Sequence, residues 1–248
     1  MSPLTVDTIL ASTFAQYQPI IDLTHNCMVA CEALARWRDL DGTVTSIGPF
    51  IEEIESNEDH VLALTERMFT CIKADLGERL IKHPNFSVNI NFSPVIIGKE
   101  KIMPMIERLG LTAHLPQITG EITERHALND VGKNAIRLAR QLGGKVAIDD
   151  FGTGLSGLQQ LLGLEVDSIK IDRSFIRLLG KDLPAERLVR GIAALATILK
   201  VEIVAEGVET EDQASFLRAI GIDKGQGWLW SKAIGPEELQ GWFVKNVP

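Results

Sequence analysis

The chain has 248 residues, 45% hydrophobic and 23% charged, which is typical of a globular protein with a buried core, built as one large domain or two small ones. Its formal net charge of −8 argues against binding to duplex DNA or to an anionic membrane surface. The longest apolar stretch, residues 191–199, is far too short for a bilayer span, so we expect no membrane insertion by this chain.

Short apolar segments rich in β-branched residues recur along the whole chain. Such continuous runs are expected for strands that are buried on both faces. In chain order they are "YQPIID" (17–22), "MVACEALARW" (28–37), "FSVNINF" (86–92), "QITGEIT" (117–123), "KVAID" (145–149), "SIKID" (168–172), "VEIVAEG" (201–207) and "KGQGWLW" (224–230).

Helical patterns lie between these segments. One helix has Pro184 just inside its start, and its apolar residues recur at i, i+4, i+7 and i+11: Leu188, Ile192, Leu195 and Leu199. A second helix begins with a capping box, Thr210 and Gln213, and its apolar stripe is Phe216, Leu217 and Ile220.

About eight strands that alternate with helices in a chain of this length predict an α/β fold, a TIM-like (β/α)8 barrel. An open, doubly wound sheet is the alternative. Only a short turn, residues 23–26, separates the first two strands, so we expect them to pair as a hairpin. The barrel would then contain one antiparallel strand.

Polar residues fall on these apolar strands, many of them near the carboxyl ends. In a barrel the carboxyl ends of the strands converge on one mouth, where active sites form. A single acidic residue at a strand end is usually a helix cap or a solvated group, but a set on successive strands predicts a shared site. The set is Glu32, Asn89, Glu121, Asp149, Asp150, Lys170, Glu206 and Gln226.

The charges of this set predict metal ions. Its five carboxylates and one lysine leave four uncompensated negative charges, which two divalent cations would neutralise. Carboxylate and amide oxygens are the ligands of hard ions such as Mg²⁺ or Mn²⁺. Two such ions, about 3.5–4 Å apart, are typical of in-line displacement at phosphorus. Lys170 would orient or help to deprotonate the attacking water, and Arg36 could hold a phosphate oxygen.

The segment "KVAIDDFGTGLSGL" (145–158) also contains two other motifs. Asp150-Phe151-Gly152 has the letters of the magnesium-binding motif of protein kinases, but the chain lacks the lysine strand and the catalytic loop that accompany it. The spacing of Gly152, Gly154 and Gly157 is that of a dinucleotide-binding turn, but two aspartates directly before it would repel a pyrophosphate. We interpret these glycines as a backbone-permissive loop near metal and substrate.

Three cysteines, Cys27, Cys31 and Cys71, lack a paired framework and any zinc-type spacing. We expect free thiols and a cytoplasmic location.

The motifs together resemble the EAL-domain family of cyclic di-GMP phosphodiesterases. The resemblance starts near residue 13 and follows the order of that family. Its pieces are "YQPI" (17–20), "EALARW" (32–37), "VNIN" (88–91), "EITE" (121–124), "DDFGTGLSGL" (149–158), "DSIKIDRSFI" (167–176), "AEGVET" (205–210) and "QGWLWSK" (226–232).

This resemblance implies a bacterial phosphodiesterase domain over residues 13–248 with an N-terminal extension, 1–12. It implies a TIM-like barrel that hydrolyses cyclic di-GMP to linear pGpG with two Mg²⁺ or Mn²⁺ ions. The family's proteins often dimerise and often carry a sensor or membrane region before this domain. The alternative is a catalytically silent domain that binds cyclic di-GMP and signals through protein contacts, but relatives of that kind usually lack metal ligands that this sequence keeps.

The resemblance also assigns roles to residues. The first metal would be held by Glu32, Asn89, Glu121 and Asp149, and the second by Asp149, Asp150 and Glu206. Lys170 would contact the nucleophilic water, so that Lys170, Glu32, Asp149 and Glu206 form the catalytic set. The substrate contacts would be Gln18, Leu34, Arg36, Asp150 and Gln226. Glu124 would steady the loop that contains Gly152, Thr153 and Gly154.

The sequence departs from the family pattern at a few positions. Asn91 stands where a serine is usual, and Ala233 where a proline is common. Ile47 and Glu52 replace prolines in the loop after "EALARW", so that loop could differ in shape. We expect none of these departures to touch a ligand. Trp228 replaces a tyrosine, either to stack on guanine or to pack in the fold.

Overall fold

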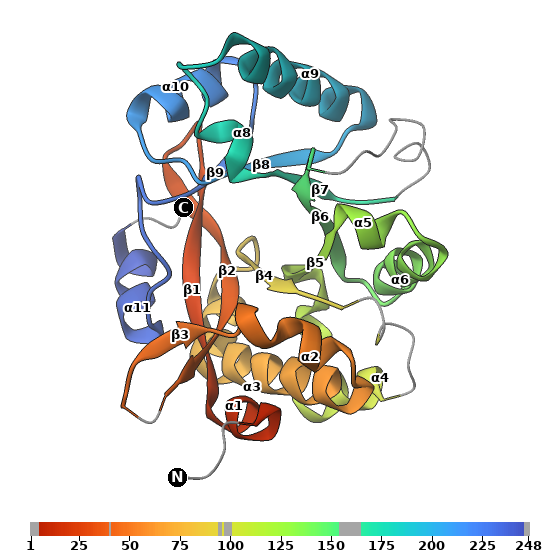
Figure 1. Ribbon diagram of the computed structural model, residues 1–248. Coiled ribbons are helices and arrows are strands. Elements are labelled where there is room, and N and C mark those ends of the chain that lie inside the picture. The colour runs from red at the N-terminus through yellow and green to blue at the C-terminus, as the bar shows by residue number, and fades with distance from the viewer. Residues whose placement is uncertain (1–4, 40, 94–95, 97–100, 154–164, 246–248) are drawn as a thin grey trace.

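The computed structural model describes residues 5–39, 41–93, 96, 101–153 and 165–245 (Figure 1). Its strands are β1 (Thr13–Asp22), β2 (Cys27–Arg38), β3 (Val44–Ser46), β4 (Ser87–Asn91), β5 (Ile118–Thr123), β6 (Lys145–Phe151), β7 (Ser168–Ile171), β8 (Glu202–Glu206) and β9 (Lys224–Gln226). Its α-helices are α1 (Val6–Ser12), α2 (Ile51–Glu55), α3 (Glu58–Lys82), α4 (Ile102–Arg108), α5 (Glu124–Ala127), α6 (Asp130–Gln141), α8 (Arg173–Ile176), α9 (Leu183–Leu199), α10 (Glu211–Ala219) and α11 (Pro236–Lys245). Two short 3₁₀ helices, η1 (Gly48–Phe50) and η2 (Thr112–Gln117), complete the set.

The strands form a closed ring in the order β1-β9-β8-β7-β6-β5-β4-β2, and the β1–β2 pairing closes it. Strand β1 runs antiparallel to both of its neighbours, β2 and β9. The other pairs within the ring are parallel. The prediction of a TIM-like barrel with one antiparallel strand is therefore confirmed, and the open doubly wound sheet is wrong. In this barrel Gly152 follows β6, whereas the dinucleotide-binding interpretation requires a turn after the first strand of a doubly wound sheet.

The β1–β2 hairpin is the longest pairing in the ring. Asp22 ends β1, and its Oδ1 accepts hydrogen bonds from the backbone N–H groups of Thr24 and His25, both at 2.8 Å. Asn26 then takes a left-handed conformation with φ +52°, which asparagine tolerates better than most residues. Strand β3 pairs with the end of β2 outside the ring. Strand β3 was not predicted, because its three residues are all exposed and show no apolar pattern.

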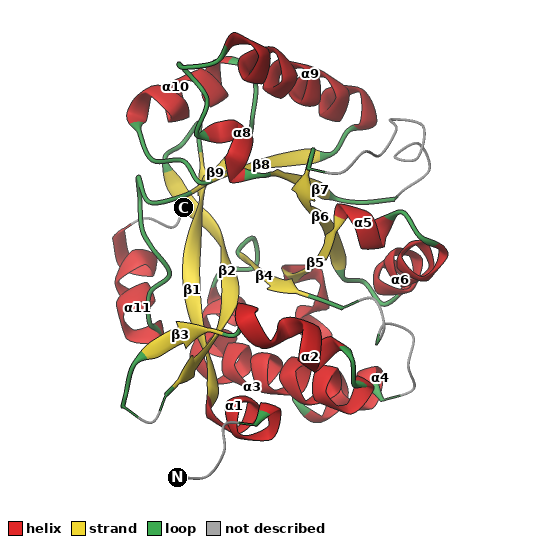
Figure 2. Cartoon of the chain, in the orientation of Figure 1, coloured by secondary structure: helices red, strands yellow, loops and turns green. Residues whose placement is uncertain are grey.

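Helices surround the ring on its outer side (Figure 2). The capping box of Thr210 and Gln213 at α10 is confirmed. In α9, by contrast, Leu188 is 45% exposed, so the predicted apolar stripe is wrong at that residue. The helix packs on the sheet through a neighbouring face with smaller residues: Ala185, Val189, Ile192, Ala193 and Ala196. Within the described part of the chain, no helix is both long and apolar enough to cross a membrane.

At their carboxyl ends two strands differ from the prediction by more than one residue, and both of these ends lie at the mouth of the barrel. The last strand stops at Gln226 rather than at residue 230, because the backbone of Gly227 passes close to Val208. A Cβ atom on Gly227 would lie 2.1 Å from the carbonyl oxygen of Val208, a contact that only glycine avoids. Strand β6 runs beyond residue 149 to Phe151, with an irregular register between Ile148 and Phe151.

Helix α1 packs against the barrel, and its residues Val6, Ile9 and Leu10 are buried in the larger hydrophobic cluster. The predicted boundary between an extension, 1–12, and a domain, 13–248, stays a prediction.

Candidate active site

Parallel strands bring the predicted polar residues to one end of the ring. Glu32 of β2 pairs in register with Asn89 of β4, and Glu206 of β8 pairs with Gln226 of β9. Lys170 lies on β7 between these two sides. In a strand every second side chain faces the same way, so these side chains point into the barrel.

Lys170 is the centre of the cluster. Its ammonium nitrogen Nζ lies 2.6 Å from Glu206 Oε1, 2.8 Å from Glu121 Oε1, 3.2 Å from Asp149 Oδ1 and 3.3 Å from Glu32 Oε2. Its side chain is only 1% exposed. One buried cation thus faces four carboxylates, which leaves net negative charge in a largely desolvated site.

Amide side chains hold two of these carboxylates in place. Gln226 Nε2 donates to Glu32 Oε2 at 2.7 Å and to Gln18 Oε1 at 3.1 Å. Asn91 Nδ2 donates to the other oxygen of Glu32 at 3.0 Å. Asn89 Nδ2 donates to Glu121 Oε1 at 2.8 Å. The expectation that Asn91 touches no ligand is wrong, because Asn91 and Asn89 are two residues apart and share one face of β4.

Burial and the neighbouring charges together change the pKa of these groups. Burial raises the pKa of Glu121 well above its ordinary value, and the charges of Glu32 and Asp149 add to the effect. Burial likewise raises the pKa of Glu206 to about 7, although Lys170 opposes this shift. For Glu32, Lys170 and the amide donors outweigh burial and lower the pKa. Burial disfavours the charge of Lys170, yet the four carboxylates outweigh it and raise the pKa of Lys170.

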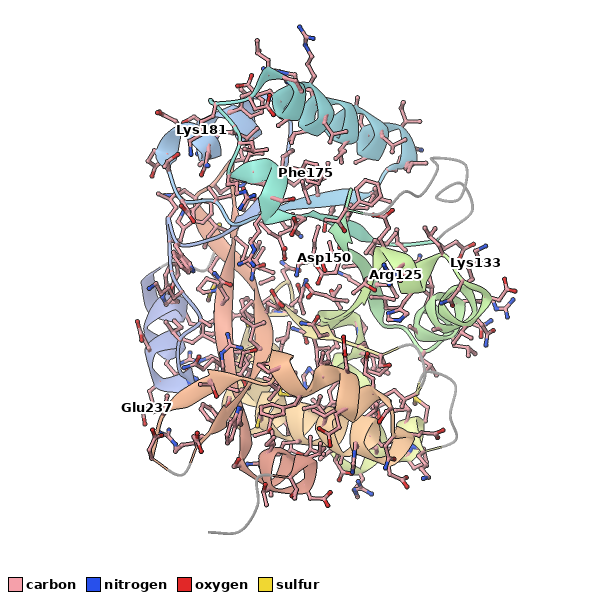
Figure 3. All side chains as sticks on the ribbon, viewed as in Figure 1. Arg125, Lys133, Asp150, Phe175, Lys181 and Glu237 are labelled. Atoms are coloured by element: carbon pink, nitrogen blue, oxygen red, sulfur yellow. The ribbon has the colours of Figure 1, made fainter. Side chains whose placement is uncertain are left out.

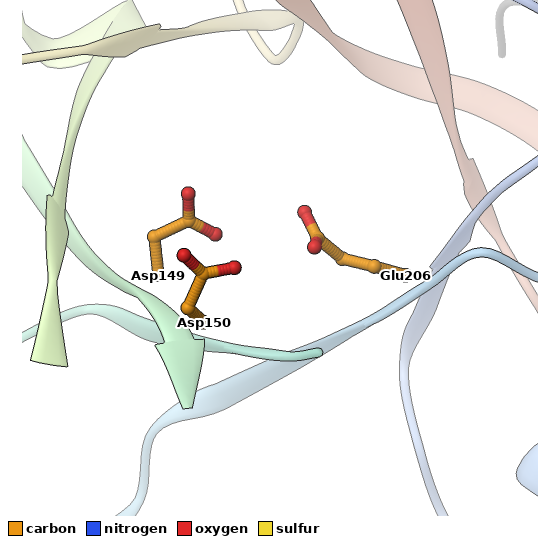
Figure 4. A group of neighbouring side chains, drawn as sticks. All are labelled: Asp149, Asp150 and Glu206. Atoms are coloured by element: carbon orange, nitrogen blue, oxygen red, sulfur yellow. The ribbon is translucent and has the colours of Figure 1, made fainter. Parts of the chain in front are cut away.

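A backbone irregularity explains how two adjacent aspartates serve one site. Neighbouring residues of a regular strand point to opposite faces, so Asp149 and Asp150 should diverge. The register shift of β6 falls at these residues, and Asp150 has a left-handed backbone with φ +54°. Both carboxylates consequently lie next to Glu206, which comes from β8 on the other side of β7 (Figure 4). One oxygen from each of the three groups lies within 4.8 Å of the others.

The donors fit a hard divalent cation. All the charged groups of the cluster except Lys170 are carboxylates, and Asn89 adds an amide. Glu121 Oε2 is buried and has no hydrogen-bond partner among the described residues, so it could serve as a metal ligand without breaking an existing bond. Asp149, Asp150 and Glu206 are the three carboxylates placed to hold one ion together.

The loop after β6 is tied to the end of β5. Glu124 Oε2 accepts a hydrogen bond from the backbone N–H of Gly152 at 3.0 Å, as its predicted role requires. Thr153 bonds back to the carbonyl oxygen of Asp150 through its hydroxyl at 2.8 Å. Gly152 has φ +96°, and a Cβ atom there would lie 2.9 Å from the ring of Phe175. Gly154 and Gly157 lie outside the described residues. Figure 3 shows Asp150 inside the ring of strands, with Phe175 and Arg125 on helices beside it.

A cavity of about 400 Å³ adjoins the acidic cluster. It reaches from Glu121 past Leu34 and Arg36 of β2 to η1 and α2. The guanidinium of Arg36 donates to Gln16 Oε1 at 3.2 Å and to the carbonyl oxygen of Ala35 at 3.0 Å. Leu34 and Arg36 therefore line a space next to the metal-binding candidates, and their contact with a substrate stays a prediction.

Gln18, another predicted substrate contact, does not belong to the lining of this cavity. Gln18 Nε2 donates to the carbonyl oxygen of Ser231 at 3.1 Å, which links β1 to the segment after β9. Trp228 is 63% exposed, so it does not pack in the core, and Lys232 Nζ lies 4.6 Å from the centre of its ring. His126 also lines the cavity, and it was not among the site residues predicted from the sequence. The one signal for His126 in the sequence is its position five residues after Glu121, just beyond the end of that strand.

Comparison with known proteins gives consistent matches over nearly the whole chain. The family model described as EAL domain matches residues 10–233. The probable cyclic di-GMP phosphodiesterase PdeB of Escherichia coli K12 is 35% identical over 237 residues, which cover 93% of this chain and 44% of PdeB. The chain thus spans less than half the length of this curated relative.

Solved structures agree with the fold. The PaMucR phosphodiesterase, solved as a c-di-GMP complex, aligns with a TM-score of 0.83 and 28% identity over 92% of this chain and 94% of that one. BlrP1 of Klebsiella pneumoniae, solved with manganese and cyclic di-GMP, aligns with a TM-score of 0.76 and 26% identity over 90% of this chain and 56% of BlrP1.

Proposed function

The chain belongs to the EAL domain family, and on that premise we propose that it is a metal-dependent phosphodiesterase that hydrolyses cyclic di-GMP to linear 5′-pGpG. The observation that carries this proposal is the buried cluster in which Lys170 meets four carboxylates beside a cavity large enough for a small ligand.

Two divalent ions, Mg²⁺ or Mn²⁺, fit this cluster. Glu32, Asn89, Glu121 and Asp149 would hold the first ion, and Asp149, Asp150 and Glu206 would hold the second. When bound, the ions would supply a water of lowered pKa and would neutralise charge on the phosphate. The raised pKa values of Glu121 and Glu206 support this assignment, because burial without a bound cation is their main cause and the charges of neighbouring carboxylates add to it.

The protein's own groups have distinct tasks in this proposal. Lys170 donates a hydrogen bond that orients the attacking water, and the neighbouring carboxylates Glu32, Asp149 and Glu206 can accept its proton. Arg36 of β2 and Gln18 of β1 bind substrate oxygens, and Leu34 and Gln226 are further substrate contacts. Glu124 keeps the loop of Gly152 and Thr153 next to Asp150.

The alternative is a silent receptor that binds cyclic di-GMP without hydrolysing it. Every proposed metal ligand and Lys170 are present in this sequence, which favours the enzyme. A homodimer, a cytoplasmic location and a further sensor region are proposals that rest on the family alone.

The test is hydrolysis of cyclic di-GMP by the purified chain with Mg²⁺, with Mn²⁺ and with EDTA, followed by chromatography. We expect pGpG to form with either metal and not with EDTA. Glu32→Gln should abolish turnover while the circular dichroism spectrum stays unchanged. Glu202→Gln is the matched control, since Glu202 forms an exposed pair with Lys224 away from the cluster and its loss should leave turnover intact. Binding of the nucleotide without turnover in either metal would favour the receptor.

A further inference from the structure

The cavity beside the acidic cluster is lined mainly by apolar side chains, among them Leu34, Ile51 and Met68. Two charged residues, Glu121 of the cluster and Arg36 of β2, also belong to its lining. Such a lining suits the flat, apolar face of a base.

His126 is a polar group on the wall of this cavity. It lies on α5, directly after the strand that carries Glu121, and its side chain is half-buried. Its ring nitrogen Nδ1 lies 3.0 Å from Thr123 Oγ1, so the ring has a fixed partner. Its second nitrogen, Nε2, makes no hydrogen bond with any of the described residues. A ring held through one nitrogen has the other available for a ligand.

The backbone beneath His126 is also held in place. A Cβ atom on Gly132 of α6 would lie 1.8 Å from the carbonyl oxygen of His126, so α5 and α6 approach each other as closely as glycine permits. Asn129 caps α6 through a hydrogen bond from the N–H of Gly132 at 2.8 Å. The neighbouring Ala127 is fully buried. The backbone of His126 is thus held in place by the packing of α5 against α6, which gives the side chain the rigid support that a specific contact requires.

We propose that His126 is a substrate-contacting residue that determines specificity, and that its ring hydrogen-bonds the edge of the guanine base seated in this cavity. The proposal rests on the proposed function, because cyclic di-GMP must be the substrate. The mainly apolar lining favours the flat face of a base in this cavity, and His126 supplies a polar group on that lining for the edge of the base. Guanine offers both acceptors and donors on its edges, so either tautomer of the ring can make the bond.

The experiment compares three variants with the wild-type chain. His126→Ala removes the contact, and His126→Gln keeps a polar atom near the position of Nε2. His25→Ala is the matched control, because His25 is 74% exposed in the β1–β2 turn, at the end of β1 away from the acidic cluster. KM and kcat are measured for cyclic di-GMP and cyclic di-AMP with Mn²⁺, and the Kd of cyclic di-GMP is measured in EDTA by calorimetry.

For His126→Ala we expect KM and Kd for cyclic di-GMP to rise about 3- to 10-fold, the loss of one neutral hydrogen bond, with kcat within about twofold. The preference for cyclic di-GMP over cyclic di-AMP should fall by a similar factor. His126→Gln should recover at least part of the affinity, and His25→Ala should change nothing.

Unchanged KM and Kd in His126→Ala, with an active wild-type enzyme, would overturn the inference and leave the proposed function standing. A fall in kcat alone would also overturn it, since the residue would then act on chemistry rather than on binding. A wild-type chain that neither binds nor hydrolyses cyclic di-GMP would instead refute the proposed function.

Discussion

Lys170 and its four carboxylate neighbours depend on each other for stability. A buried charge that loses its partner costs about 3–5 kcal/mol, far more than the same loss at the surface. We therefore expect Lys170→Met to lower the free energy of unfolding by about this amount in EDTA and to abolish turnover. Lys224→Met is the control, because Lys224 pairs with the exposed Glu202 and its loss should cost about 0–1 kcal/mol. Urea denaturation of both variants measures the difference, and equal losses would contradict this account of the cluster.

The same carboxylates predict how metal binding depends on pH. The pKa of Glu206 is raised to about 7, so Glu206 holds a proton at pH 6 in the metal-free site, and the pKa of Glu121 is shifted in the same direction. A metal needs the ionised carboxylates and must release these protons. The apparent affinity for Mn²⁺ should therefore increase as the pH rises from 6 to 8, by up to about tenfold per pH unit for each proton released.

Calorimetry at pH 6, 7 and 8, in buffers with different ionisation enthalpies, counts the released protons directly. Glu202→Gln should show the same pH dependence as the wild-type chain, because Glu202 lies outside the cluster. An affinity that stays constant over this range would mean that Glu206 is already ionised at pH 6.

Residue type and order in the sequence were sufficient to predict most of the cluster. Glu32, Asn89, Glu121 and Lys170 lie on strands that the apolar runs had already indicated, and their convergence follows from the barrel. The contact of Asn91 with Glu32 was missed for a different reason. It depends on the length of an amide side chain and on the stagger between β2 and β4, and neither can be read from a single strand.

At the level of elements, β6 shows the limit of pattern analysis most clearly. The pair Asp149-Asp150 indicated a shared site, but a regular strand would have pointed the two side chains apart. The irregular register and the left-handed backbone of Asp150 bring them together. No apolar pattern encodes such a bulge, since it depends on pairing with β7.

The contact between α5 and α6 leads to a prediction about glycine. Alanine usually stabilises a helix relative to glycine by about 0.5–1 kcal/mol. Gly132→Ala should do the opposite, and we expect a loss of about 1–3 kcal/mol because the added methyl group would overlap the carbonyl oxygen of His126. Gly191→Ala in α9 is the control, since a Cβ atom there meets nothing within 4 Å, and it should stabilise the protein.

Urea denaturation gives the sign of both changes. Stabilisation by Gly132→Ala would show that α5 can move away from α6, and the rigid support assigned to His126 would be wrong. If the loss is found, the Kd of cyclic di-GMP in EDTA should also rise in Gly132→Ala, because the added methyl group displaces α5 and His126 is part of α5.

For the whole molecule, the barrel could be predicted because its strands are buried on both faces and alternate with helices. The face of α9 that packs on the sheet could not be predicted. Leucine spacing alone selected Leu188, whereas the close approach of helix and sheet favours the small side chains of Ala185, Ala193 and Ala196. Which stripe a helix buries depends on the shape of the surface beneath it, and that surface forms only when the ring closes.

The ring also means that a bound metal should stabilise the molecule as a whole. The proposed ligands come from β2, β4, β5, β6 and β8, so the ions would join strands on all sides of the mouth. At 100 times its Kd a ligand adds about 2.7 kcal/mol, which for a domain of this size corresponds to a rise in Tm of about 5–11 °C. We expect Mn²⁺ to produce this rise and EDTA to reverse it.

Glu32→Gln should reduce the rise in Tm caused by Mn²⁺, and Glu202→Gln should not. Hydrogen exchange should slow in all five strands together, because each of them carries a proposed ligand. Slower exchange confined to β6 and β8 would mean that only Asp149, Asp150 and Glu206 bind metal.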